Sequence, residues 1–318
     1  MVTARIHRPG SVALGLLVDR LAGEPPDAVH PVARFGAAMD RLERRWWADR
    51  RDTGAGYAAL GVGGALLVGV LAESLLGQAV ALAFTVSVSS SGRALTEAAD
   101  VVARNLRAGD LEGARQALPS LVGRDPTDLC ESEIVRAVVE SLAENLSDAV
   151  VATALWGLLA GAPGALGHRA SNMLDAMVGH RNARHARFGW AAARLDDVLG
   201  WPSARATALL VAMAVPRRTG AIWRACRVDA LGHPSPNAGV AEAAFAAALD
   251  VRLGGTNRYG CREETRPLLG SGSAPSEPDI GRAIALVRRT TLVLELLLVG
   301  VWLAARLARP RATETEVA

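Results

Sequence analysis

The chain contains no lysine, because all 35 of its basic residues are arginine. It therefore cannot contain a Walker A lysine, a Schiff-base lysine or a lysine that activates a carboxylate in a nucleotide-dependent ligase. Any phosphate must be held by arginine, by backbone amides or by a metal ion. The 32 acidic residues nearly balance the arginines, so the formal charge of +3 offers no large field for a nucleic acid. We expect no nucleic-acid partner.

Cysteine is also scarce. Cys130, Cys226 and Cys261 are scattered and form no C-x-x-C pair. This spacing argues against a disulfide framework and against a structural zinc site. We expect the polar regions to face a reducing compartment.

Long apolar runs are the most prominent positive feature. Residues 57–86 carry one charge, Glu73, and residues 290–305 carry only Glu295. Such runs predict membrane helices. The first run divides near Glu73 and Gly77, and we interpret it as a helical hairpin rather than one tilted, kinked span. The short apolar run 12–18 predicts a retained helix at the membrane, since no small-residue cleavage site follows it.

The rest of the chain also has helical patterns. A polar helix is expected from Gly92, and another begins near Glu133, capped by Asp128 or Ser132, before entering the membrane. Gly and Pro in 161–167 break that helix, and residues 201–215 form a partial or interfacial span. Sustained period-2 alternation is absent from the sequence. The fold class is therefore all-α, a polytopic integral membrane protein with amphipathic and polar cytoplasmic helices.

Three regions follow from this pattern. Residues 1–92 hold the N-terminal helix and hairpin, 93–289 form a helical catalytic region with partial spans, and 290–318 form the last span and tail. Arginine-rich flanks predict which ends of the spans face the cytoplasm. We expect a multi-pass protein of the cell (inner or plasma) membrane, with these arginines on the cytoplasmic side: Arg41, Arg44, Arg45, Arg50, Arg51, Arg217, Arg218, Arg224, Arg227, Arg288 and Arg289.

The densest group of chemically active side chains is acidic. Glu140, Glu144 and Asp148 stand at i, i+4 and i+8, which places three carboxylates in a column on one helix face. A divalent ion such as Mg²⁺, completed by substrate phosphates, would relieve their repulsion. The alternative is a solvated helix face with Arg136 as a local ion-pair partner.

A second group follows the predicted break. Asn172 and Asp175 share a helix face with Gly179, and Arg181 lies just past the expected end of the helix. The face suits a metal or a hydroxyl group, and arginine suits a phosphate. The alternative is an ordinary helix whose basic end favours the macrodipole. Asp196 and Asp197 are interpreted as a surface pair, since adjacent residues do not share a helix face.

Two loops downstream carry weaker signals. His233 lies in a proline-fixed loop, where it serves as acid, base or ligand, or has no chemical role. Gly254 and Gly255 permit backbone amides to approach a phosphate, with Arg258 assisting.

Taken in order, these blocks resemble the CobD/CbiB family, the adenosylcobinamide-phosphate synthases of cobalamin biosynthesis. The resemblance covers roughly residues 30–260 together with the membrane spans. Its carriers are His30-Pro31-Val32, Gly123-Arg124-Asp125, Glu140-Ser141, Glu144-Asn145, Ser147-Asp148, Asn172 through Gly179, Ala193 through Asp197, Ser235 through Gly239, Gly254-Gly255 and Tyr259-Gly260.

This resemblance implies an amide bond between a carboxylate of adenosylcobyric acid and the amine of (R)-1-amino-2-propanol phosphate, with ATP and Mg²⁺ as cofactors. It also implies roles for the residues. Glu140, Glu144 and Asp148 hold Mg²⁺, and Asp175 or His233 accepts the amine proton. Substrate is bound by Arg124, Asp125, Asn145, Asn172, Arg181, Asn237, Arg258 and Tyr259. Other corrinoid-pathway enzymes and membrane lipid are the expected partners.

Two other functions compete with this one. Asn145-x-x-Asp148 and Asn172-x-x-Asp175 are paired N-x-x-D elements that suit a membrane Mg²⁺-dependent prenyltransferase. Such an enzyme needs more fully apolar spans than this chain offers. A non-catalytic membrane subunit that organises corrinoid enzymes is the other alternative.

Overall fold

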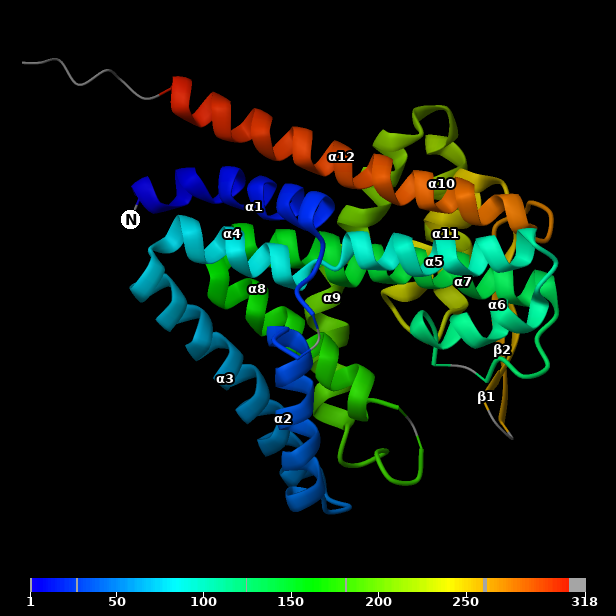
Figure 1. The fold of residues 1–318 in the computed structure, drawn as a ribbon, viewed down its shortest axis with the longest axis horizontal. Helices are drawn as coiled ribbons and strands as arrows, with labels where there is room; N and C mark the ends of the chain where they lie inside the picture. The colour runs from blue at the N-terminus through cyan, green and yellow to red at the C-terminus, as the bar shows by residue number, and fades with distance from the viewer. Residues whose placement is uncertain (1, 27, 124, 181, 260–261, 309–318) are drawn as a thin grey trace, which may run out of the picture.

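The protein folds almost entirely into helices (Figure 1). The structure is a computed structural model that describes residues 2–26, 28–123, 125–180, 182–259 and 262–308, without the side chains of 2–6, 257–259 and 262–264. Its elements are α1 (Val2–Ala22), α2 (Pro31–Trp46), α3 (Arg51–Leu76), α4 (Gln78–Ser89), α5 (Gly92–Arg107), α6 (Leu111–Ala117), η1 (Leu118–Ser120), α7 (Glu131–Asn145), η2 (Leu146–Val151), α8 (Ala152–Val178), α9 (Trp190–Ala214), η3 (Pro216–Arg218), α10 (Thr219–Val228), η4 (Asp229–Gly232), α11 (Ala238–Leu249), β1 (Leu253–Tyr259), β2 (Arg262–Leu269) and α12 (Glu277–Leu307).

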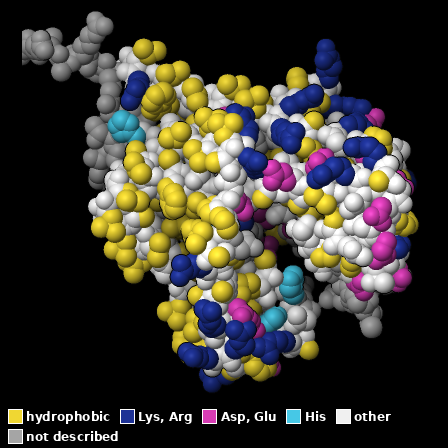
Figure 2. Space-filling view, viewed as in Figure 1, with side chains coloured by type: hydrophobic (Ala, Val, Ile, Leu, Met, Phe, Trp, Pro, Cys, Tyr) yellow, Lys and Arg dark blue, Asp and Glu magenta, His cyan; other side chains and the backbone are white. Residues whose placement is uncertain are grey.

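Among the described residues, three helical stretches are long and apolar enough to cross a membrane: α3, Glu131–Val178 and α12. Together, α9 and Pro216–Gly232, which are bent by 112° relative to each other, would make a fourth if the pair forms one span. Hydrophobic side chains gather on the outer surface over α1, α3 and α4 (Figure 2). The chain is thus an all-α polytopic membrane protein, as the sequence predicts.

The predicted hairpin is confirmed in its break point but not in its second arm. The chain turns at Gly77, where φ is 79°. Only α3 is long enough to span by itself, because α4 has 12 residues and packs its buried side against α1 and α8. A helix of that length is about 18 Å long.

The stretch from α7 to α8 reverses its direction at Gly161. That residue has φ 71° and ψ −157°, a conformation that essentially only glycine adopts. The rings of Trp156 and His168 stack with centroids 6.5 Å apart. In a straight helix, these two residues would be about 18 Å apart along the axis. The predicted break is therefore confirmed, and it produces two antiparallel arms rather than a kinked rod.

Two charged side chains hold this reversal. The Arg8 guanidinium donates to the carbonyl oxygens of Leu158 (3.2 Å) and Leu159 (2.6 Å), at the end of the first arm. Glu73 accepts a hydrogen bond from the N–H of Ala162 (2.9 Å), at the start of the second arm. A cation at a helix C-terminus and an anion at an N-terminus both complement the macrodipole. This pairing explains the single charge in the apolar run 57–86.

The end of the molecule away from α3 and α4 contains α5, α6, α7, α10 and α11 (Figure 1). All residues of α11 are buried, and α7 packs against it. The first residue of α7 is Glu131, and its N-cap is Cys130, whose N–H donates to Glu133 (2.9 Å). The predicted caps, Asp128 and Ser132, are therefore wrong by two residues in either direction. The capping-box glutamate at the third position decides the start of the helix.

The sequence patterns also miss the antiparallel hairpin of β1 and β2. Its glycines do not form an open phosphate loop. Gly254 and Gly255 both have positive φ and lie at an irregularity in the strand register. The N–H of Gly254 donates to Glu140 (2.9 Å), and Arg136 donates to the carbonyl oxygens of Gly254 and Thr256. The polar groups of the Gly254 backbone are therefore used in fastening the hairpin to α7.

Candidate active site

A group of polar side chains, the central site, lies where the open end of the reversed helix meets α5 and α9. Acidic side chains gather around a hollow near the middle of the molecular face in Figure 2. The site contains two polar side chains from the second arm, one from the π-helical turn η2, one from the N-cap of α5, and one each from α7 and α9. These residues are Ser91, Glu144, Asp148, Arg169, Asn172 and Asp196.

Asp148 reaches the site through an irregular turn of helix. The α-helix of α7 widens into a π-helix over Leu146–Val151, so the i+4 spacing no longer fixes the direction of Asp148 relative to Glu140. Asp148 accepts a hydrogen bond from Asn172 (3.3 Å), which the reversal at Gly161 brings back from the second arm. The charges of Asp196 and Glu144 also act on Asp148 from nearby.

Arg169 is the cation of the central site. Its terminal nitrogens donate to Asn172 (3.3 Å) and Ser91 (3.4 Å), both long hydrogen bonds. Within the described part of the chain, its buried Nε has no hydrogen-bond partner. The charges of Asp148 and Asp196 act on the guanidinium. A buried donor without a partner is costly, which favours a ligand at this position.

Asp196 is also incompletely satisfied. Its Oδ1 is buried and has no hydrogen-bond partner among the residues that the structure describes. Its neighbours include Asn172, Glu144 and Asp175, whose charges or hydrogen bonds act on it. The sequence interpretation of Asp196 as a surface residue is therefore wrong. The prediction used only the α-helical phase of Asp196. It could not include the packing of α8 against α9, which covers this residue.

Asp175 lies beside this group on the second arm. Its carboxylate folds over Gly179, where an added Cβ would lie 1.8 Å from Oδ1. Its charge acts on Asp196, and the charge of Asp197 acts on Asp175. The shared face of Asn172, Asp175 and Gly179 is thus confirmed as part of one polar region.

The segment before α2 lies over the central site. His30 caps α2 by accepting the N–H of Val32 (3.2 Å), and its Nε2 lies 3.7 Å from Glu24. The charge of Glu24 acts on both Arg169 and Asp19. The conformation that the proline-rich segment adopts therefore places one more acid, Glu24, near the arginine.

Asp19 gives this region a pH-dependent stability. It is 4% exposed and accepts the N–H of Gly92 (2.9 Å). Burial raises the pKa of Asp19 from its ordinary 3.8 to about 6, the Gly92 hydrogen bond opposes the rise, and the charge of Glu24 adds to it. The folded state thus binds this proton more tightly than the unfolded state. The resulting stabilisation is complete below about pH 4 and is lost as the pH rises through about 6.

We expect Asp19→Asn to remove this component of the pH dependence. The amide keeps an oxygen acceptor for Gly92 but has no proton to lose. Between about pH 4 and pH 7, the wild type should lose about 3 kcal/mol of unfolding free energy through this group, and the variant should lose none of it. Thermal unfolding in detergent across this range measures the difference. Equal slopes for both proteins would contradict the assignment.

A cavity of about 140 Å³ adjoins the central site on the side of α7. Glu144 belongs to both. The other lining residues include Glu140, Ser141, Glu242 and Arg266, with the backbone of 121–123. Glu140 also accepts the N–H of Gly254 and lies 3.9 Å from Arg136. These contacts give Glu140 a role in fastening the β-hairpin.

His233 lies beside Glu242, which lines this cavity. Its Nδ1 accepts the N–H of Ser235 (3.1 Å), and its Nε2 lies 3.7 Å from the buried carboxylate of Glu242. Its contacts are thus with the loop before α11 and with α11 itself. Of the two predicted proton acceptors, only Asp175 lies beside the central site.

Hard oxygen donors are present for a magnesium ion, but no complete ligand cage is. Among the described residues, no three His, Cys, Asp or Glu side chains converge closely enough to ligate one ion. Mg²⁺ commonly uses one or two carboxylates and takes its other ligands from water and substrate phosphates. Asp148 and Asp196, with the amide of Asn172, fit that pattern. Glu140 does not, since Gly254 and Arg136 engage it.

The comparisons with known proteins agree with one another. Residues 12–287 match the model of the CobD/Cbib protein family, and this range includes every residue of the central site. The chain belongs to this family. It is 45% identical to the cobalamin biosynthesis protein CobD of Mycobacterium tuberculosis over 88% of this chain and 91% of that protein. Proteins of the same name from Rhodobacter capsulatus and Chromobacterium violaceum are 42% and 40% identical, covering 91% and 93% of this chain and 96% and 94% of theirs. No solved structure matches it.

The remaining residues predicted to bind substrate in this CobD/CbiB protein lie in different elements and make contacts of their own. Asp125 accepts the N–H and hydroxyl of Thr127, and Asn145 donates to Ser141 within α7. Asn237 donates to the carbonyl of Asp197 (2.9 Å), which ties the loop before α11 to α9. Four predicted residues lie outside the described residues or have side chains that are not described: Arg124, Arg181, Arg258 and Tyr259.

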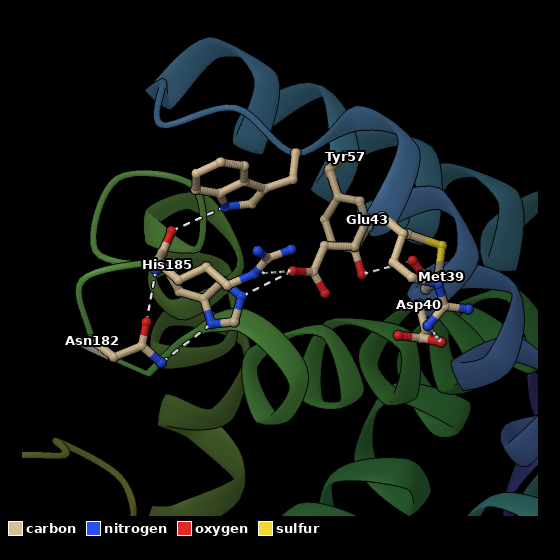
Figure 3. Close-up of polar contacts among 9 residues, drawn as sticks. Met39, Asp40, Glu43, Tyr57, Asn182 and His185 are labelled. Atoms are coloured by element: carbon tan, nitrogen blue, oxygen red, sulfur yellow. Dashed lines mark hydrogen bonds and ion pairs between the residues drawn. The ribbon is translucent and has the colours of Figure 1, made fainter.

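The arginine-rich loop after α8 is fastened to α2 (Figure 3). Glu43 is 9% exposed and accepts from Arg184 Nε (3.0 Å), and its Oε1 lies 3.0 Å from His185 Nε2. Asn182 accepts the N–H of His185 (2.8 Å), and the Arg184 guanidinium lies 4.7 Å from the ring centroid of Trp47. The loop of this family member is therefore held against the first part of the chain rather than extended from it.

Proposed function

We propose that this cobalamin biosynthesis protein joins the amine of (R)-1-amino-2-propanol phosphate to a carboxylate of adenosylcobyric acid, giving adenosylcobinamide phosphate. The observation that supports this most directly is the central site. It sets one incompletely bonded arginine, Arg169, beside several carboxylates and an amide. Such a pairing complements a small ligand that carries both a phosphate and an ammonium group. The names of the relatives favour this reaction over prenyl transfer.

In this proposal, the chain binds the amino alcohol phosphate and removes its proton. Arg169 binds the phosphate through its planar guanidinium. Asp175 accepts one proton from the ammonium group, so that the freed nitrogen lone pair attacks the activated carboxyl carbon. A carbon–nitrogen bond forms, the carbon–oxygen bond to the activating phosphoryl group breaks, and the phosphate leaves with the bonding electrons and takes up the second proton that the nitrogen loses. Asp175 lies close enough to Asp196 for their charges to interact, so the proton acceptor is adjacent to the proposed magnesium ligands.

The cofactors proposed for this reaction are ATP and Mg²⁺. ATP supplies the phosphoryl group that converts a poor leaving group into a good one. The residues that would hold Mg²⁺ are Asp148 and Asp196, with Asn172 beside them and Glu144 at the cavity edge. The previously expected ligand Glu140 is not included, because its contacts fasten β1 to α7.

The proposed location is the cell membrane, with the central site facing the cytoplasm. The support is the set of arginine-rich flanks beside the membrane helices, which the positive-inside rule places on that side. Soluble nucleotide and phosphorylated substrates would then reach the site directly. Other corrinoid-pathway enzymes and membrane lipid remain proposed partners.

Corrinoid analysis tests the proposed reaction. In cells that lack this chain, mass spectrometry should show adenosylcobyric acid accumulating and adenosylcobinamide phosphate missing. The purified chain, given adenosylcobyric acid, the amino alcohol phosphate, ATP and Mg²⁺, should restore the product. If cells that lack the chain make no product, and the purified chain also makes none, the non-catalytic subunit would be favoured instead. Accumulation of a later intermediate, such as adenosylcobinamide phosphate itself, would refute the proposed step.

A further inference from the structure

The end of α2 and the start of α3 carry arginines that the fold does not neutralise. Four ion pairs engage the acids of this region: Asp40 with Arg44, Asp52 with Arg50, Glu43 with Arg184, and Asp49 with Arg187. Among the described residues, no carboxylate lies within ion-pair distance of Arg41, Arg45 or Arg51. All three are exposed. Basic side chains gather at this end of the molecule in Figure 2.

Exposed tryptophans lie among these arginines. Trp190 donates its indole N–H to the carbonyl of Arg51 (2.9 Å), and the Arg51 guanidinium lies 6.0 Å from its ring centroid. Trp47 donates in the same way to the carbonyl of Arg184 (3.1 Å). Trp46 is 45% exposed, and Trp190 is 41% exposed. Tryptophan beside arginine is the composition of a membrane–water interface.

The position along α3 agrees with such an interface. This 26-residue helix begins at Arg51, and its exposed apolar side chains begin at Leu60 and continue to Leu76. At 1.5 Å per residue, Leu60 lies about 14 Å along the helix from Arg51. The start of α3 is thus on the aqueous side of the apolar stretch, and from there a long arginine side chain can reach toward a headgroup layer about 5–7 Å thick.

The surface is also rigid. The contacts of Glu43 with Arg184 and His185 hold the loop after α8 against α2 (Figure 3). Gly54 of α3 would place a Cβ 1.8 Å from the carbonyl oxygen of Phe188, so this loop packs directly on α3. The backbone segments that carry the surface are therefore held in place before any ligand binds, which lowers the entropic cost of binding.

We infer that this basic surface binds the headgroups of anionic phospholipids. Its defining residues are Arg41, Arg45, Arg51, Trp46, Trp47 and Trp190. The arginine forks bind the lipid phosphates, and the indoles lie at the boundary of the acyl chains. The inference does not depend on the reaction proposed for the central site.

Lipid titration of the purified full chain in neutral detergent tests the inference. Short-chain phosphatidylglycerol should raise Tm at concentrations where short-chain phosphatidylcholine and glycerol 3-phosphate do not. Each arginine near an anionic lipid surface contributes about fivefold in affinity. The triple variant Arg41→Gln/Arg45→Gln/Arg51→Gln should therefore need at least about tenfold more phosphatidylglycerol for the same shift.

Two further variants make the result specific. Arg104→Gln/Arg107→Gln/Arg252→Gln removes three exposed arginines elsewhere and should respond as the wild type does. Arg41→Lys/Arg45→Lys/Arg51→Lys keeps the charge and should keep most of the response, even where the Gln variant folds poorly. An equal response to phosphatidylcholine, or an unchanged response in the Gln variant, would overturn the inference. An equal response to glycerol 3-phosphate would show that the surface binds free phosphate and not lipid.

Discussion

Asp148→Asn is expected to lower the rate of amide formation by about 10²- to 10³-fold, which is the range seen when one preorganised electrostatic contact to a transition state is lost. The amide has nearly the shape of the carboxylate and still offers an oxygen to Asn172. A loss of rate would thus be caused by the missing negative charge of residue 148, which lies beside Arg169 and the proposed phosphate-bearing substrates. The measurement is turnover by the purified chain across a range of Mg²⁺ concentrations.

Asp100→Asn is the matched control. Asp100 lies on α5, its side chain is 52% exposed, and it pairs with Arg104 in a surface ion pair. Surface pairs contribute about 0–1 kcal/mol, so this variant should have wild-type turnover. Turnover of the Asp148 variant close to that of the control, at saturating Mg²⁺, would remove Asp148 from the site.

Gly161→Ala is expected to destabilise the protein and to inactivate it together. A Cβ at this position would lie 2.2 Å from Glu73 Oε1, and the backbone conformation excludes alanine even without that clash. Strain of this kind costs about 1–3 kcal/mol before the steric overlap is added. The two arms would then shift, and Asp148 would no longer meet Asn172. A fall in Tm of about 6 °C or more, with loss of turnover below the new Tm, is expected.

Gly64→Ala controls for the added methyl group. Gly64 lies in α3, and a Cβ there meets nothing within 4 Å. Alanine has the higher helix propensity, so the control should be as stable as the wild type or slightly more stable. If Gly161→Ala behaved like this control, the reversal at Gly161 would not be the constraint that shapes the site.

Much of the fold can be predicted from the hydrophobic periodicity of the sequence and from its helix-breaking glycines. Apolar runs locate α3 and α12, and Gly77 and Gly161 mark the two breaks as predicted. The hairpin of β1 and β2 escaped prediction, because its strands show no period-2 alternation and its glycines look like a loop. Tertiary contacts from Arg136 and Glu140 hold these glycines in place.

The site was predictable in its residue types more than in its geometry. Asp148, Asn172 and Asp175 were identified as candidates, and the structure brings them into one region. Arg169 and Asp196 were not. Nothing in their local spacing shows that the two arms run antiparallel or that a π-helical turn redirects Asp148. Residues 148 and 172 lie at nearly equal distances along the sequence from the predicted break. If the chain reverses at that break, two such residues come to lie opposite each other, and this is the one signal that would have indicated their contact.

The central claim is that the chain reverses at Gly161 and thereby assembles the site. Cross-linking tests it directly, with cysteines at Trp156 and His168 in a chain whose three natural cysteines are replaced. The rings of these residues are 6.5 Å apart here, whereas a straight helix would separate them by about 18 Å. A bis-maleimide, whose two ends each add one cysteine thiol, should link them within one chain in nearly every molecule when its spacer is too short to bridge the roughly 18 Å of a straight helix. No intramolecular link, in protein that still forms product, would contradict the account.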